Sequence, residues 1–259
     1  MSATDALLEP LPWETRNLGI ESFAVSDAFL RSPDTGTLNA CLADLHQTHG
    51  TTFVQARFTT NTKTAQILEA SGFYFVEATL SPFIALPKYS ALERFAADPS
   101  LVLPERCKAA DLEVVIVGES TPDIVAPIRE IAGESFVADR FHVDHNCDPD
   151  MANRRYVLWV DDLLRDDAVR FHVLLFRKEA IAFMASKAGD LLLAGFGRAH
   201  ANRGLGEFFW LRVLEDLRRE GVNGVSTVIS VNNTSALNLY ARLGFKFREP
   251  RSTFHLWTR

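Results

Sequence analysis

A short segment rich in arginine and glycine runs from Arg198 to Gly206, between a predicted strand and a predicted helix. Glycines at a helix start let the backbone approach a ligand, and the unpaired amides of the first turn point at that ligand with the positive end of the helix dipole behind them. From Arg198 to Arg219 there are five Arg against three Asp or Glu, a local charge of +2 in a chain of formal net charge -6. The segment therefore predicts a cradle for a pyrophosphate, although such glycines are also common turn residues.

A second set of residues that could do chemistry lies in a helical pattern that begins 27 residues after Gly206. It carries Asn233 and Tyr240 and ends at Gly244. At about 3.6 residues per turn, Asn233 and Tyr240 fall on almost the same helix face. Asn233 could contact a ligand through its amide, but asparagine is also a favoured N-cap, which alone explains the residue type.

The segment from His142 to Asp148 holds two histidines, two aspartates and Cys147, which are residue types that ligate metals. The spacing of His142 and His145 would suit one helical face, but the proline that follows Asp148 favours a loop. We expect no metal here, and we prefer a loop that lines a substrate site or a plain solvated loop.

Hydrophobic periodicity predicts the elements that position these residues. In the C-terminal part, the runs 171–177, 181–186 and 191–197 predict a three-stranded antiparallel meander. An amphipathic stripe predicts a helix over 206–220 ended by Gly221, and β-branched residues predict a strand buried on both faces over 225–231. The remaining predictions here are a strand at 112–117, helices near 123–136, 150–164 and 233–243, and a last strand pair within 245–257.

The N-terminal third has its own alternation and a linker after it. The predicted strands are 20–25, 52–58 and 74–80, and the predicted helices are 36–46 and 62–70. The stretch 96–110, with Pro99 and Pro104, is the predicted linker. The whole order predicts an α/β (α+β) fold with a mixed, mostly antiparallel sheet flanked by helices, and a boundary near residue 105.

An internal repeat links the two parts. The segment NTKTAQILEASGF at 61–73 aligns without gaps with NTSALNLYARLGF at 233–245, and each copy lies between predicted strands. Leu68 stands where the second copy has Tyr240, so any chemistry of the phenol exists only in the C-terminal copy. Chance similarity between two Leu- and Ala-rich helices that end in Gly-Phe remains an alternative.

Composition excludes several function classes for this chain of 259 residues. With 47% hydrophobic and 23% charged residues, it is expected to fold as a soluble protein. The 27 Lys and Arg against 33 Asp and Glu argue against nucleic acid as a partner. No apolar run reaches the roughly 18 residues of a membrane span. Because its first residues also lack a signal-peptide pattern, we expect a cytoplasmic protein whose three cysteines stay reduced.

The arginine-glycine loop and the helical pattern after it resemble the GCN5-related N-acetyltransferase (GNAT) superfamily. The family loop is usually written Q/R-x-x-G-x-G/A, and residues 201–206 read A-N-R-G-L-G. Ala201 departs from that pattern, which puts in doubt side-chain help from this position but leaves the backbone contacts. The family pattern N-x-x-A-x-x-x-Y-x-x-x-G-F is matched over 233–245, and the resemblance covers about 110–259.

The resemblance implies how acetyl-CoA, the expected cosubstrate, would bind. Its pantetheine amides would pair with the backbone in a wedge between two strands, a backbone amide would polarise the thioester carbonyl, and no metal takes part. A phenol, with a reference pKa of about 10, could protonate the departing thiolate, and Tyr240 is in place for this role. The implied cofactor-binding residues are Ala194, Phe196, Arg203, Gly204, Leu205, Gly206 and Asn233.

The general base is less clear from the sequence. Many relatives place a carboxylate on the strand before the loop, but no Asp or Glu lies between Leu191 and Ala199. The remaining candidates are His200, His142, Asp144 and Glu134, or a water that relays the proton.

A narrower resemblance concerns the acceptor. A truncated, degenerate GNAT-like unit at 1–105 before a catalytic unit at 106–259 is similar to the dTDP-fucosamine acetyltransferases, as are residues 191–206 and the surroundings of Ser135, Arg140 and Trp159. This implies the amine of an amino sugar nucleotide, a surface polysaccharide precursor, as acceptor, and a homodimer. Another small amine, such as an amino acid, a polyamine or an antibiotic, and a non-catalytic CoA-binding protein are the alternatives.

Overall fold

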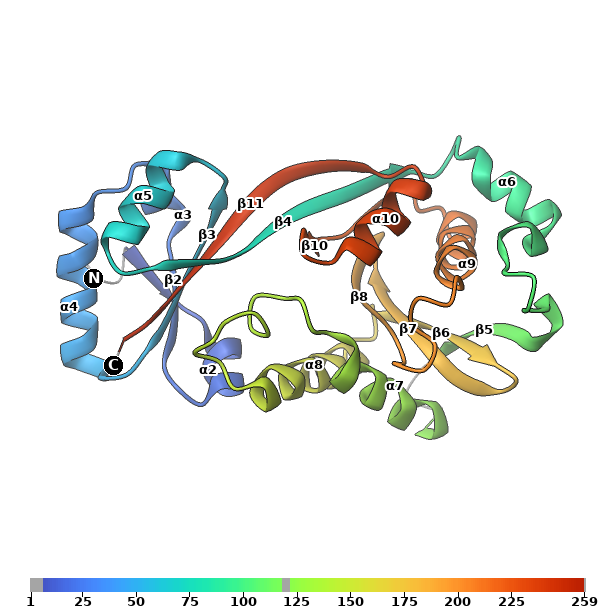
Figure 1. The fold of residues 1–259 in the computed structure, drawn as a ribbon, viewed down its shortest axis with the longest axis horizontal. Coiled ribbons are helices and arrows are strands. Elements are labelled where there is room, and N and C mark those ends of the chain that lie inside the picture. Colours follow the sequence, from blue (N-terminus) through green and yellow to red (C-terminus); the bar gives the residue numbers. More distant parts are fainter. Residues whose placement is uncertain (1–6, 118–121, 259) are drawn as a thin grey trace.

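The computed structural model describes residues 7–117 and 122–258 (Figure 1). The N-terminal strands are short except for the last, and helices follow each of the first three. In chain order these elements are β1 (Leu8–Pro10), α2 (Pro12–Leu18), β2 (Ser22–Val25), α3 (Asp27–Arg31), α4 (Thr35–His49), β3 (Phe53–Thr59), α5 (Thr62–Ala70) and β4 (Tyr74–Ala85).

The connection to the C-terminal part is partly helical. It contains α6 (Ser90–Ala97) and two 3-10 turns, η1 (Pro99–Val102) and η2 (Ala109–Asp111). The C-terminal elements are β5 (Leu112–Val117), α7 (Pro122–Ser135), α8 (Pro149–Leu164), β6 (Arg170–Phe176), β7 (Glu179–Lys187), β8 (Asp190–Phe196), α9 (Gly206–Arg219), β9 (Gly224–Ser226), β10 (Ile229–Ser230), α10 (Thr234–Arg242) and β11 (Lys246–Trp257).

One sheet of 11 strands runs through the described chain in the order β1-β2-β3-β11-β4-β9-β8-β7-β6-β5, with β10 paired to β4 off this path. Neighbouring strands are antiparallel except for β2 with β3 and β8 with β9, which are parallel. The predicted fold class, a mixed and mostly antiparallel sheet flanked by helices, is confirmed. No helix in the described ranges is long and apolar enough to cross a membrane.

Helices cover both faces of the C-terminal half of the sheet. On one face α9 buries Phe209, Val213 and Leu217, which recur at helical spacing, against β7, β8 and β9. On the other face α7 and α8 pack on alternate residues of the same strands, such as Phe183 and Leu193 (Figure 1). The N-terminal half differs, because α4 and α5 form one apolar core on one face of its strands.

The two copies of the internal repeat form equivalent local structures. Asn61 and Asn233 cap α5 and α10, and each side-chain oxygen accepts a hydrogen bond from the backbone amide three residues later, at 2.8 and 3.0 Å. After each helix a glycine adopts a positive φ, 88° at Gly72 and 79° at Gly244, which favours glycine. The repeat is therefore a repeated helix and turn in the folded chain.

The strands that follow the two repeat helices cross between the halves of the sheet. β4 follows α5 but pairs with β9 and β10, whereas β11 follows α10 but pairs with β3. The two strands also pair with each other along their length (Figure 1). Each half thus receives a strand from the other, and the boundary near residue 105 stays a prediction.

Two strand predictions were wrong. The expected strand over 225–231 is split into β9 and β10, and Val228 between them is 58% exposed rather than buried. The expected strand pair over 245–257 is the single strand β11, whose pairing with β4 shifts register around Glu249, a residue with φ 50°. In both places the partner strand comes from the N-terminal half, which local periodicity does not reveal.

Candidate functional site

Strands β8 and β9 form a wedge that is closed at one end. They pair only at Asp190 and Ser226 within the described chain. The closed end is tight, because a Cβ on Gly189 would lie 2.5 Å from the carbonyl oxygen of Gly224. Beyond this point Thr227 Oγ1 donates to the carbonyl oxygen of Leu191 at 2.8 Å, and the strands then diverge.

The open part of the wedge exposes one edge of β8. Ala194 and Phe196 pair with Met184 and Ala182 of β7 on one side, but β9 offers no partner on the other. Backbone polar groups at such an edge need a partner, which an extended ligand with amide groups can supply. Ala194 and Phe196, which the family resemblance implies as pantetheine contacts, lie on this open edge of β8.

The loop before α9 ends in an uncapped helix start. Leu205, at the N-cap position, provides no side-chain hydrogen bond to the first turn. The amides of that turn therefore remain free to bind an anion, with the helix dipole aligned behind them. Arg198, Arg203 and Gly204 are exposed beside this helix start, and they suit a pyrophosphate.

The two glycines of the loop also have packing reasons. Gly204 has φ 82°, and a Cβ there would lie 3.0 Å from Pro104 Cγ of the linker. A Cβ on Gly206 would lie 3.1 Å from Leu239 Cδ2 of α10. Arg106 of the linker also donates to the carbonyl oxygen of Arg203 at 3.1 Å. Substituting either glycine would disturb packing as well as any ligand contact.

Tyr240 lies in the core beside the closed end of the wedge. It is 3% exposed and packs edge-on against Trp210 and Phe245. Burial raises the pKa of Tyr240 to about 12, while polar contacts of its hydroxyl with Trp210 and Thr227 act in the opposite direction. The phenol is therefore protonated at neutral pH. Because Thr227 also donates a hydrogen bond to β8, the phenol lies where the two strands separate.

Asn233 is exposed at the start of α10, close to the loop before α9. Its side-chain oxygen is engaged as the N-cap, so the residue type has a structural explanation. Ser235 in the first turn of α10 donates to Asn202 Oδ1 of the loop at 3.1 Å. This contact brings the helix start to the same end of the wedge as the loop.

The carboxylate and imidazole groups considered as bases are mostly engaged elsewhere. Glu134 Oε1 accepts a hydrogen bond from the backbone amide of Arg198 at 2.8 Å. His142 contacts Asp139 through Nδ1 and lies 2.9 Å from Asn153 Oδ1 through Nε2. Burial lowers the pKa of His142, but its hydrogen bonds with Asp139 and Asn153 outweigh burial, and the net effect is a raised pKa.

Asp144 is the centre of a buried hydrogen-bond cluster. Its oxygens accept from Tyr74 Oη at 2.7 Å, His255 Nδ1 at 2.8 Å, Trp257 Nε1 at 2.9 Å and the backbone amide of Asn146 at 2.9 Å. Burial raises the pKa of Asp144, but the hydrogen bonds from His255 and Trp257 outweigh it and hold this pKa well below its usual value. Such a carboxylate holds the 139–148 loop against β4 and β11 and is a weak base.

The 142–148 segment is therefore not the plain solvated loop considered from the sequence. Asp144 is 2% exposed and Cys147 is 6% exposed. No group of three metal-ligating side chains occurs within residues 7–117 and 122–258.

Sequence reasoning missed a second buried charge cluster that joins α2 to the C-terminal part. Glu14 accepts hydrogen bonds from Arg140 and Arg155, each at 2.9 Å through its Oε1. Pro12 at the first helical position is a recognised start signal that could have revealed α2.

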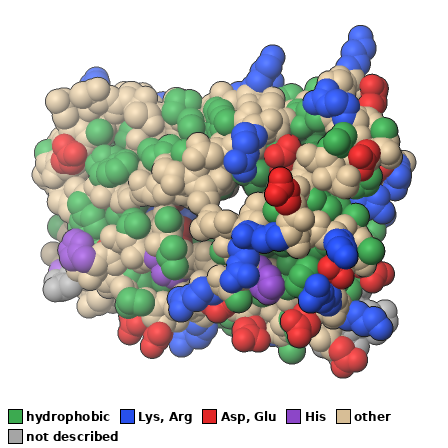
Figure 2. Space-filling model, turned by 45° about the vertical axis from the view of Figure 1, so that its right-hand side comes forward, with side chains coloured by type: hydrophobic (Ala, Val, Ile, Leu, Met, Phe, Trp, Pro, Cys, Tyr) green, Lys and Arg blue, Asp and Glu red, His purple; other side chains and the backbone are tan. Residues whose placement is uncertain are grey.

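Figure 2 shows the molecule hollowed near its centre, with Lys and Arg side chains above and below the opening.

The comparisons with known proteins agree with this geometry. Residues 126–245 match the family model described as "Acetyltransferase (GNAT) family". A "Mycothiol acetyltransferase" of Nocardia farcinica (strain IFM 10152) is 35% identical over 101 residues, which are 37% of this chain and 33% of that protein. The matched stretch thus spans about a third of the curated relative.

Solved structures share the fold at low sequence identity. A GCN5-related N-acetyltransferase from Sphaerobacter thermophilus has a TM-score of 0.62 and 15% identity, covering 97% of this chain and 76% of its own. A tandem GNAT protein from the clavulanic acid biosynthesis pathway has a TM-score of 0.55 and 15% identity, covering 92% and 75%. Over residues 126–245, the chain is thus similar to the GNAT acetyltransferase family.

Proposed function

We propose that this protein is an acetyl-CoA-dependent N-acetyltransferase. The observation that carries the proposal is the splay of β8 from β9 directly beside the uncapped start of α9. The open edge of β8 suits the two amides of pantetheine, and the helix start with Arg203 suits the pyrophosphate. These two features lie on consecutive segments of the chain, so one extended molecule could occupy both.

The proposed reaction transfers the acetyl group directly from acetyl-CoA to the acceptor amine. The free amine of the acceptor attacks the thioester carbon, a nitrogen–carbon bond forms, and the carbon–sulfur bond breaks. The thiolate takes a proton from Tyr240, and the acceptor nitrogen loses a proton to a base. The buried phenol, whose pKa is raised to about 12, stays protonated until the thiolate forms beside it.

For the acceptor, the narrower resemblance favours the amine of an amino sugar nucleotide. The alternatives are another small amine, for which the mycothiol acetyltransferase relative is one precedent by name, and CoA binding without catalysis. Tyr240 favours catalysis over simple binding, because a phenol beside the wedge has a chemical role only if a thiolate leaves.

The N-terminal part is proposed to be a reduced second GNAT-like unit that binds no CoA. Its repeat has the fully buried Leu68 in place of the phenol, and no arginine-glycine loop precedes Asn61. The likeness in fold to a tandem GNAT protein over 92% of the chain supports this proposal.

A titration calorimetry experiment and a thiol-release assay test the function together. CoA should bind at one molecule per chain, and acetyl-CoA should release thiol only when an amine substrate is added. A panel of amino sugar nucleotides and small amines then ranks the acceptors by kcat/KM. Two CoA molecules per chain would contradict the proposed role of the N-terminal part, and absence of CoA binding would contradict the function itself.

A further inference from the structure

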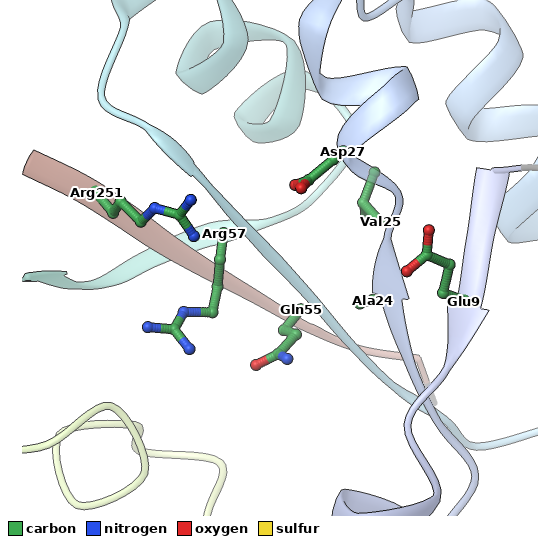
Figure 3. Close-up of a pocket in the computed structure, with 7 residues that line it drawn as sticks. All are labelled: Glu9, Ala24, Val25, Asp27, Gln55, Arg57 and Arg251. Atoms are coloured by element: carbon green, nitrogen blue, oxygen red, sulfur yellow. The ribbon is translucent and has the colours of Figure 1, made fainter. Parts of the chain in front are cut away.

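The face of the N-terminal half of the sheet opposite α4 and α5 carries polar side chains, next to a small apolar cluster in which Phe53 of β3 packs with Leu18 of α2 and Phe141. On β3, Val54, Ala56 and Phe58 point into the core under α4 and α5. Successive strand residues point to opposite faces, so Gln55 and Arg57 lie on the other side. Figure 3 shows both side chains pointing to the same side of β3.

Three of these polar residues form a row across adjacent strands. Thr253 of β11 pairs with Arg57 of β3 on one side and with Glu77 of β4 on the other. Residues paired in this way have Cβ atoms roughly 5 Å apart. A cation, a hydroxyl and a carboxyl group are thus aligned on one surface.

Several polar atoms on this face have no partner among the described residues. They include Thr253 Oγ1, on a residue that is 0% exposed, Gln55 Oε1, on a residue that is 8% exposed, and Arg57 Nε. Buried polar atoms in folded proteins nearly always have partners. Their arrangement along one face indicates a binding surface for a polar ligand rather than a structural network.

The part of this face near β2 forms a small pocket with two arginines on one wall and two carboxylates on the other. The pocket has a volume of about 210 Å³ and is lined by Arg57, Gln55 and Arg251, with Glu9 and Asp27 on the far side (Figure 3). Burial lowers the pKa of Arg57 to about 10, and the nearby Arg140 and Arg251 contribute to this shift. Arginines placed together at such a cost suit a carboxylate or phosphate group.

At the other end of the row, Glu77 lies near β10, the short strand that follows β9 in the chain. It is 3% exposed, and Thr79, two residues further along the same face of β4, pairs with Ser230 of β10. Burial and, to a lesser degree, Asp139 raise the pKa of Glu77, whereas Arg140, Arg57 and a hydrogen bond with Ser230 lower it, with a net rise. A buried carboxylate of raised basicity is suited to take a proton from an ammonium group.

We propose that this face is the acceptor site, where Arg57 and Arg251 hold an anionic group of the acceptor and Glu77 takes the proton that its amine loses. The inference rests on the proposed acetyl transfer and names its acceptor class, an amine that also carries a carboxylate or phosphate. The proton passes from the acceptor nitrogen to Glu77 and then to solvent, while Tyr240 protonates the sulfur. A base on β4 also accounts for the lack of any carboxylate between Leu191 and Ala199.

Matched pairs of acceptors test the charge requirement directly. With saturating acetyl-CoA, the probes are glucosamine against glucosamine 6-phosphate and UDP-glucosamine, and alaninamide against alanine. The anionic member of a pair should have a kcat/KM roughly 10- to 100-fold higher, which is the range expected for charge-assisted hydrogen bonds. A phosphate preference and a carboxylate preference are told apart by which pair responds.

Variants then assign the two ends of the row. Arg57→Gln should raise KM for the anionic probes by roughly 10- to 100-fold, leave KM for the neutral probes unchanged, and not lower the urea midpoint, because Arg57 Nε has no hydrogen-bond partner among the described residues. Arg31→Gln, an exposed arginine on α3, is the matched control. A fall in the urea midpoint without a change in KM would mean that Arg57 is structural.

Glu77→Gln should lower kcat by roughly 10²- to 10⁴-fold and remove the acid limb of the pH profile, with partial rescue by Glu77→Asp. CoA affinity should not change. Glu69→Gln, an exposed carboxylate on α5 behind the same sheet, is the control and should retain full activity. An unchanged acid limb in a folded Glu77→Gln variant would show that Glu77 is not the base.

Failure of the inference is distinguishable from failure of the proposed function. Equal acetylation of neutral and anionic probes would overturn the acceptor site while acetyl transfer stands. If CoA binds but no probe reacts, calorimetry of UDP-glucosamine and alanine with the CoA-saturated protein decides, and absence of binding overturns the inference. If CoA does not bind at all, both proposals fail.

Discussion

Removal of the Asp144 carboxylate should destabilise the fold strongly. The group accepts four hydrogen bonds of 2.7 to 2.9 Å, three of them from the side chains of Tyr74, His255 and Trp257. Each donor left unsatisfied in a buried place costs about 1–3 kcal/mol. Tyr74 is only partly buried and can reach water, and neighbouring effects do not add fully. We therefore expect Asp144→Ala to lower the free energy of unfolding by about 3–5 kcal/mol.

Urea unfolding at pH 7, followed by tryptophan fluorescence, measures this loss. Asp144→Asn keeps one carbonyl oxygen as acceptor and should lose less than Asp144→Ala. Asp34→Ala is the control, because Asp34 is an exposed N-cap of α4 that accepts from Gly36 and Thr37; its loss should be about 1 kcal/mol. If Asp144→Ala loses no more than Asp34→Ala, the 139–148 loop is not held by this carboxylate.

The remaining predictions concern pH, the proton donor and the CoA loop. Burial lowers the folded-state pKa of both His255 and His172. As the pH drops, the unfolded chain therefore takes up protons before the folded chain does, and Tm should fall below about pH 6.5. A Tm that stays flat between pH 7 and 5 would contradict this prediction. Tyr240→Phe should keep CoA affinity and lose about 10²- to 10⁴-fold in kcat, whereas Tyr89→Phe, which loses a hydrogen bond to a backbone carbonyl at 2.6 Å, should keep its kcat; equal rates for both variants would remove the phenol from the mechanism. Arg203→Ala should weaken CoA binding by roughly 10-fold in calorimetry without shifting the urea midpoint, and an unchanged affinity would place the pyrophosphate elsewhere.

Local sequence patterns predicted the elements whose signals are complete within one segment. Helix α9 begins at Gly206 as predicted, because its apolar stripe and its glycine boundaries are both local. The caps of α5 and α10 follow from asparagine at the first position of each repeat. The exchange of β4 and β11 between the halves depends on pairing between strands far apart in the chain, which no local period encodes.

The candidate acceptor face shows why a binding site can escape such patterns. Gln55 and Arg57 alternate with apolar residues on β3, a pattern that is typical of a solvent-exposed strand face. In the folded chain the 139–148 loop packs on this face beside Phe53, and Gln55, Glu77 and Thr253 are buried. Only the structure places Glu77 in the same row as Arg57.

The central claim is that the wedge and the loop before α9 bind acetyl-CoA. In this account Tyr240 protonates the CoA thiolate when the acetyl group is transferred to an amine. Quantifying free thiol and N-acetylated product together, in the wild type and in Tyr240→Phe, tests it most directly. We predict thiol and N-acetyl product in equal molar amounts in the wild type, and a parallel loss of both in the variant. Thiol release without an acetylated amine, or equal product formation by the two proteins, would contradict the account.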